Sequence, residues 1–206
     1  TNDRLQDREG YSLAAGLALG LVTLGKGNNA PGLEDLQIEN QLRRYMIGGR
    51  DASLTAVAAP DPTVCCRIKE GDNVNVDVTA PGATLALGLM FMRTNSKSVA
   101  ARLDVPDTNF TLQYVRPDLV LLRMLARSLI MWDEIEPTKE WVESRMPEIV
   151  RKAALSKSSP TTEATTADGD NVGGGASLFA DQDTLRHLHA NIVAGGCMAI
   201  GLRFAG

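Results

Sequence analysis

One segment of the chain has the spacing of a phosphate-binding loop. Gly20–Lys26 reads Gly-x-x-x-x-Gly-Lys, the pattern in which backbone amides surround phosphates and the lysine reaches them. The next residue is Gly27 instead of the serine or threonine that would hold Mg²⁺. The segment also follows a helical pattern, whereas the motif requires a preceding strand. We therefore predict the turn that ends a helix, and no nucleotide site.

A second segment is similar to part of a calcium-binding loop. Asp168–Gly173 places acidic side chains at alternate positions before a glycine. However, Val172 supplies no side-chain ligand, and Phe179 stands where such a loop needs a bidentate glutamate. We predict a solvated surface loop here.

The histidines and cysteines do not combine into a site. His187 and His189 are two residues apart, so on a helix they point about 200° apart and cannot share a metal ion. Cys197 is predicted to be a buried small apolar residue, and Cys65-Cys66 to lie on opposite faces of a strand. Three cysteines, two of them adjacent, indicate a reducing compartment. No catalytic residue, metal ligand or cofactor is predicted.

One residue has a regulatory interpretation. Ser159-Pro160 is the minimal site of a proline-directed kinase, and a phosphate there would add nearly two negative charges. The surrounding stretch, Ser156–Asp183, is rich in Ser, Thr, Gly and Asp, so we expect a flexible surface loop.

Composition narrows the class of protein. The 206 residues carry a net charge of −4, which argues against a nucleic-acid binder with a basic face. Two uncharged runs, Gly10–Gly25 and Val78–Met92, are shorter than the ~20 apolar residues of a membrane-spanning helix. We expect no membrane partner and no nucleic-acid partner.

A short motif recurs along the chain. Its core, Ala-[Leu/Ile]-Gly-Leu, has its alanine at positions 18, 86 and 199, and a fainter copy with serine for glycine has its alanine at position 126. The spacings are 68, 40 and 73 residues, and a period near 40 is typical of helix-pair repeats. Because glycine costs a helix interior about 1 kcal/mol, we expect neighbouring helices to pack very closely at the motif. The residues predicted to make these contacts are Ala15, Gly16, Ala18, Gly20, Ala83, Ala86, Gly88, Ala126, Ser128, Gly196, Ala199 and Gly201.

The motif divides the chain into four predicted units within one domain, 1–206. Each unit is a pair of helices, except that the chain stops after the first helix of the last. The expected helices cover Tyr11–Leu24, Leu33–Ile47, Gly82–Arg93, Lys97–Leu103, Pro117–Trp132, Lys139–Ala154 and Asp183–Phe204. The units therefore span about 10–49, 80–104, 116–155 and 183–206, and the fold class is all-α.

Two insertions separate these units. The one at 156–182 is the polar loop, and the other, at 50–79, contains a predicted β-hairpin. Its strands are Val64–Ile68 and Val74–Val78, the second alternating apolar and polar residues, with Lys69–Asn73 as the turn.

These residues resemble the proteasome/cyclosome repeat family. Tyr11–Leu21 has the appearance of one such repeat. Repeats of this kind occur in proteasome regulatory-particle scaffolds and in the largest scaffold subunit of the anaphase-promoting complex. Resemblance to the second kind is closer and is carried by Ile68–Leu87, Arg102–Thr108, Leu121–Arg127 and Gly201–Gly206.

The resemblance implies a non-catalytic piece of an α-toroid of stacked helix pairs. Its partners would be other subunits of the anaphase-promoting complex, a ubiquitin ligase of mitosis whose chemistry lies on cullin and RING subunits, in the nucleus and cytoplasm. The alternative is a proteasome scaffold that binds ubiquitin or ubiquitin-like domains. A small enzyme, which would need a deep pocket with converging ionisable groups, is a third possibility. We also expect the isolated piece to self-associate through exposed apolar edges.

Overall fold

The computed structural model describes residues 3–48, 69–70, 73–108, 112, 115–155 and 182–205. In these residues the chain is all-α, as predicted, apart from one short strand pair. The elements are α1 (Asp3–Val22), η1 (Glu34–Leu36), α2 (Ile38–Ile47), β1 (Lys69–Glu70), β2 (Asn73–Val74), α3 (Val76–Met90), α4 (Lys97–Ala100), η3 (Ala101–Leu103), α6 (Pro117–Ile130), η4 (Trp132–Glu134), α7 (Lys139–Ser144), α8 (Glu148–Leu155) and α9 (Gln182–Phe204).

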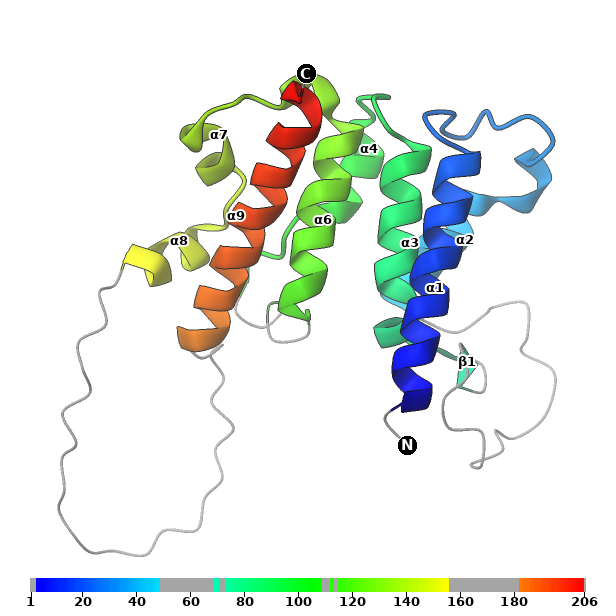
Figure 1. Cartoon of the computed structure of the whole chain (residues 1–206), viewed down its shortest axis with the longest axis horizontal. Coiled ribbons are helices and arrows are strands. Elements are labelled where there is room, and N and C mark those ends of the chain that lie inside the picture. The colour runs from blue at the N-terminus through cyan, green and yellow to red at the C-terminus, as the bar shows by residue number, and fades with distance from the viewer. Residues whose placement is uncertain are drawn as a thin grey trace, which may run out of the picture.

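Four long helices stand side by side and form a row (Figure 1). In this row α1 packs on α3, α3 on α6, and α6 on α9. The shorter helices pack against the row, since α2 contacts α3, α4 contacts α6, and α7 and α8 contact α9. Segments separated by long insertions therefore become direct neighbours.

The core between these helices consists of aliphatic, small and sulfur-containing side chains. Ala86 and Leu87 of α3 and Ile130 of α6 are fully buried in one cluster with residues of α2. A second cluster joins Val150 of α8 to Ile192 of α9. Such a core suits a chain with only 4% aromatic residues.

The predicted hairpin differs from the structure. Helix α3 begins at Val76, so the strand expected over Val74–Val78 is wrong beyond Val74, and the expected strand Val64–Ile68 lies outside the described residues. The antiparallel ladder pairs Lys69 with Val74 and Glu70 with Asn73, within the segment predicted as the turn. Alternation over only five residues is too short to decide between a strand and the start of a helix.

Helix α3 also contains Pro81. The predicted helix began only after this proline, at Gly82. Proline has no N–H, so the carbonyl of Asp77 lacks its usual helical donor. Arg116 Nη1 donates to this carbonyl oxygen at 3.4 Å. A neighbouring side chain thus satisfies the acceptor that the proline leaves free.

Two other predicted helices are interrupted. The stretch Leu33–Ile47 is divided between η1 and α2 at Gln37, whose φ of +46° is left-handed. The stretch Lys139–Ala154 is divided between α7 and α8 before Pro147, because proline disfavours a helical conformation at the residue that precedes it. The predicted loop at Ser156–Asp183 lies outside the described residues except for its last two, which begin α9.

Candidate interaction surface

The closest helix contact lies between α1 and α3. A Cβ added to Gly16 would overlap the carbonyl oxygen of Gly82, and one added to Gly82 would overlap the carbonyl oxygen of Ser12. One turn further along, a Cβ at Gly20 would lie 2.8 Å from Leu89 Cβ and 3.1 Å from Ala86 Cα. The two backbones approach so closely that only glycine fits at these places.

The next pair of helices meets at the following copy of the motif. A Cβ added to Gly88 would lie 2.6 Å from Ala126 Cβ and 2.8 Å from Ala126 Cα. Gly20 thus contacts Ala86, and Gly88 contacts Ala126. In both cases the motif glycine of one helix meets the motif alanine of the next.

The contact between α6 and α9 uses a different glycine. A Cβ at Gly195 would lie 2.8 Å from the carbonyl oxygen of Leu121 and 3.0 Å from Met124 Cβ, whereas one at Gly196 would lie 3.1 Å from Val142. Ser128 and Ala199 are buried, and the Ser128 hydroxyl donates to the carbonyl of Met124 at 2.7 Å.

Turns after the helices repeat a hydrogen-bond pattern. After α1, the amides of Gly25 and Gly27 donate to the carbonyls of Leu89 and Met90 at 3.0 and 2.8 Å. After α3, the amides of Arg93 and Asn95 donate to the carbonyls of Leu129 and Ile130, at 2.9 and 3.0 Å. The four donors all have left-handed backbones, with φ between 53° and 67°. The segment similar to a phosphate loop is therefore a helix-ending turn bonded to α3.

Some of the predicted contact residues are not packed in this chain. Ala15 and Ala18 on α1 and Gly201 on α9 are exposed, and a Cβ at Gly201 would meet nothing within 4 Å. They lie on α1 and α9, the helices at the two ends of the row, and no further helix of the row covers their outer faces. Ala83, in contrast, is buried in α3. Cys197, predicted to be buried, is exposed, which corrects that prediction.

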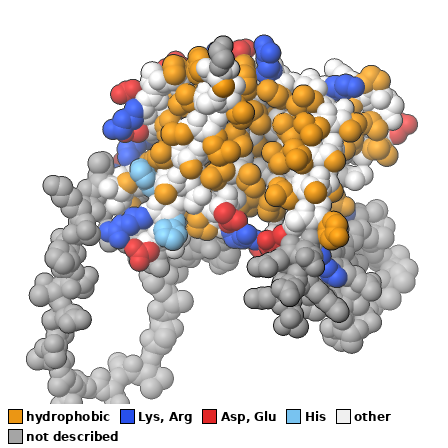
Figure 2. All heavy atoms as spheres, in the orientation of Figure 1, with side chains coloured by type: hydrophobic (Ala, Val, Ile, Leu, Met, Phe, Trp, Pro, Cys, Tyr) orange, Lys and Arg blue, Asp and Glu red, His pale blue; other side chains and the backbone are white. Residues whose placement is uncertain are grey.

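The row presents an apolar face. Figure 2 shows hydrophobic side chains gathered across the face formed by the four long helices. Large apolar side chains exposed on its end helices are Tyr11, Leu13, Leu17, Leu21 and Val22 on α1 and Met198, Leu202 and Phe204 on α9. A large apolar patch on a protein surface is typical of a protein-binding site.

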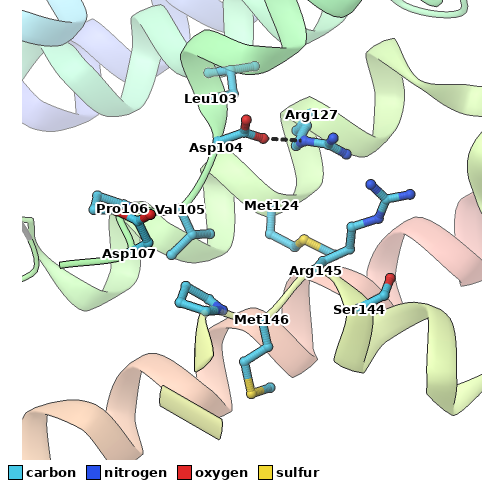
Figure 3. A pocket seen from close by; sticks show the side chains of 11 residues that line it. Leu103, Asp104, Val105, Pro106, Asp107, Met124, Arg127, Ser144, Arg145 and Met146 are labelled. Carbon is cyan, nitrogen blue, oxygen red and sulfur yellow. Dashed lines mark hydrogen bonds and ion pairs between the residues drawn. The ribbon is translucent and has the colours of Figure 1, made fainter. Parts of the chain in front are cut away.

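Two hollows lie beside α6. One, of about 510 Å³, is lined by side chains that include Asp104, Arg127, Arg145 and Met146 (Figure 3). Its arginines are paired, because Arg127 Nε lies 2.6 Å from Asp104 Oδ1 and Arg145 Nη2 lies 3.0 Å from Glu134 Oε2. The second hollow, of about 470 Å³, lies at the first turns of α3 and α6.

Two ion pairs of Arg116 link α1 to the first turn of α6. Arg116 Nη1 lies 3.0 Å from Glu9 Oε1 of α1, and Arg116 Nη2 lies 2.7 Å from Asp118 Oδ2 of α6. Burial raises the pKa of Asp118, but hydrogen bonding and charge attraction from Arg116 outweigh it, so the pKa lies below its ordinary value. The hydrogen bond to Asp118, opposed in part by burial, raises the pKa of Arg116.

The candidate metal and modification residues are not brought into a site. Among the described residues, no group of three His, Cys, Asp or Glu side chains could hold a metal ion. His187 lies exposed on α9 and His189 is half-buried there. Ser159 and the segment Asp168–Gly173 lie outside the described residues, so their interpretations stay predictions. No helix in the described part of the chain is both long and apolar enough to cross a membrane.

Comparison with known proteins identifies the family. The sequence profile described as the APC1 fifth domain matches residues 1–206. The chain belongs to the APC1 fifth-domain family.

Relatives of the APC1 fifth-domain chain come from animals, plants and fungi. It is 45% identical over 201 residues to anaphase-promoting complex subunit 1 of Homo sapiens, covering 97% of this chain and 10% of that protein. It is 40% identical over 204 residues to the Arabidopsis thaliana subunit, covering 99% and 11%. It is 37% identical over 206 residues to the Emericella nidulans protein named negative regulator of mitosis, covering 100% and 8%. The chain thus spans about a tenth of the length of these relatives.

Sequence reasoning missed two contact glycines of this APC1 domain, Gly82 and Gly195. Gly82 stands at the predicted start of a helix, and Gly195 stands beside Gly196, which occupies the motif position. Gly16 lies four residues before Gly20 on α1, and Gly82 lies six before Gly88 on α3. A search for a second small residue one to two turns before each motif glycine would have found Gly82.

Proposed function

We propose that this chain is a non-catalytic scaffold segment of the anaphase-promoting complex, built from proteasome/cyclosome repeats. Membership of the APC1 fifth-domain family supports the assignment to this complex. The observation that carries the scaffold role is the recurring contact in which Gly20 meets Ala86 and Gly88 meets Ala126. A contact repeated in one register between successive helices builds an extended support in which each unit touches its neighbours.

The same register predicts how the row continues. Ala18 occupies on α1 the motif position that receives a glycine in α3 and α6, and it is exposed. Gly201 occupies on α9 the position that meets the next alanine, and a Cβ there has open space around it. Further helix pairs therefore extend the row at both ends, and the curved or closed α-toroid is the arrangement that we propose for the larger domain.

Partners of the scaffold are other subunits of the ubiquitin ligase, inside the cell in nucleus and cytoplasm. The ubiquitin-transfer chemistry belongs to those subunits in this proposal. We do not propose that this segment itself binds ubiquitin or transfers it. A proteasome scaffold with the same repeats is the alternative, and the relatives named above disfavour it because 97% or more of this chain aligns with subunit 1 or a mitotic regulator.

Affinity purification of the full-length protein that carries this segment tests the proposal. We expect cullin and RING subunits to co-purify in stoichiometric amounts. Recovery of proteasomal ATPase subunits in their place would overturn the assignment. Replacement of Gly88 by leucine should reduce assembly of the complex, whereas alanine at Gly10, an exposed helical position outside the motif, is the control.

Phosphorylation of Ser159 is a separate proposal within this role. A proline follows the serine, and a mitotic ubiquitin ligase is exposed to proline-directed kinases when it acts. Mass spectrometry of the complex from mitotic cells should detect the phosphopeptide. An unmodified Ser159 at good peptide coverage would refute it.

A further inference from the structure

A groove of about 470 Å³ lies where the first turns of α3 and α6 meet the end of α2. Its walls are partly apolar and include Met46, Ile47, Val115 and Leu119. Ile47 is 61% exposed although it is apolar. A hollow of this size is large enough to take one or two side chains of a binding segment.

The guanidinium of Arg123, which lines the groove, has no partner among the residues that the structure describes. Arg123 of α6 makes no hydrogen bond or ion pair with any residue that the structure describes, and its buried Nε is unsatisfied. Its desolvation lowers the pKa of the guanidinium. Arg123 as a whole is half-buried, and partial burial of a cation without a compensating anion costs free energy.

The two arginines nearest to Arg123 in this part of the chain both form ion pairs. Arg116, at the rim of the same groove, is paired with Glu9 and Asp118. Arg127, one turn after Arg123 on α6, is paired with Asp104 (Figure 3). Among the described residues, carboxylates pair with Arg116 and Arg127 but none pairs with Arg123.

Charge complementarity defines what would fit. A carboxylate placed against Arg123 would satisfy its N–H groups with charge-assisted hydrogen bonds, and the planar guanidinium suits bidentate contact with such a group. The apolar side chains around it would cover aliphatic residues on either side of the carboxylate. The first turn of α3, which borders the groove, already carries the carboxylate of Asp77, so the attraction for an incoming acidic side chain comes from Arg123.

We propose that this groove binds an extended segment of another protein through an aspartate or glutamate, flanked by apolar residues, that pairs with Arg123. This inference rests on the proposed scaffold role, which it deepens by assigning one docking site and the chemistry of its partner. Its failure would leave co-purification with the ligase subunits unaffected, so the two proposals fail separately.

Selection of peptides tests the proposal. A phage-displayed library of random dodecapeptides is panned against the 206-residue chain, with circular dichroism to verify that it is folded. We expect enriched peptides to share one acidic residue between apolar residues. Their affinity should fall about tenfold or more with Arg123→Gln, and equally when the acidic residue of the peptide is changed to its amide.

Controls make the outcome decisive. Arg186→Gln on α9 removes the same charge far from the groove and should leave affinity unchanged. Ile47→Gln alters an exposed wall residue without affecting the core, and should weaken binding even if Arg123→Gln proves to disturb folding. Absence of enriched peptides, enrichment of peptides without an acidic residue, or equal binding by Arg123→Gln would each overturn the proposal. Peptides that bind the chain but not the full-length protein would assign the groove to a segment of the same protein and would also overturn it.

Discussion

Arg93 donates its backbone amide to the carbonyl oxygen of Leu129 at 2.9 Å, from a left-handed conformation with φ of +61°. Gly25 makes the same bond to Leu89 after the preceding helix. The donors are 68 residues apart and the acceptors 40, which are the spacings of the sequence motif. The turn after each of these helices is thus fixed to the end of the next helix by a backbone bond in a repeated register.

The left-handed turn after α1 predicts how much stability is lost when a methyl group is added to Gly27. A Cβ at Gly27 would lie 3.4 Å from the Phe91 ring, so there is room for alanine, but the φ of +55° is unfavourable for it. Gly27→Ala should therefore destabilise the fold by about 1–2 kcal/mol, measured by urea unfolding. Gly10→Ala, in an open helical position, should be neutral or stabilising. Equal effects of the two changes would argue against a backbone origin.

Packing at the motif predicts a second loss of stability. Gly88→Leu would force a side chain into the contact with Ala126, and overpacking of this kind should cost about 1–3 kcal/mol or more. Thermal unfolding measures the effect. The same motif position on α9 provides the control, since Gly201→Ala meets no neighbour. An unchanged melting temperature for Gly88→Leu would contradict a close contact between α3 and α6.

The sequence predicted the four long helices because their motif combines helix-forming residues with small ones at helical spacing, but α1 begins at Asp3 and α3 at Val76, before the predicted starts at Tyr11 and Gly82. It could not predict which faces are covered: Ala18 and Ala86 share a motif position, yet only Ala86 has a neighbouring helix. Cys197 was misplaced for the same reason, since its burial depends on what stands beside α9. The docking groove was not foreseen at all. It forms from segments far apart in sequence, and the missing partner of Arg123 becomes evident only when its surroundings are known.

The ion pair between Asp118 and Arg116 predicts a dependence of stability on pH. The folded-state pKa of Asp118 is lowered, so its contribution is present above the ordinary value of 3.8 and is lost as the pH falls through the folded value. Asp118→Asn should therefore reduce the free energy of unfolding slightly at pH 7, and the difference from the unmodified chain should vanish in strong acid. Because the Asp118 side chain is 60% exposed, the effect should be small. Urea unfolding at several pH values measures it, and a difference that grows on acidification would contradict the assigned direction.

The exposed edges of the row predict self-association of the isolated chain. Leu202 on α9 is 55% exposed and Leu21 on α1 is 54% exposed, and each lies next to a motif glycine. Contact between the α9 edge of one copy and the α1 edge of another would bury this apolar surface, and such a head-to-tail contact does not close on itself. Light scattering should show a mass that rises with concentration, and Leu202→Glu should restore the monomer. Leu36→Glu, at an exposed leucine of η1 that belongs to neither α1 nor α9, should not. A monomer at high concentration in the unmodified chain would show that these edges do not associate with one another.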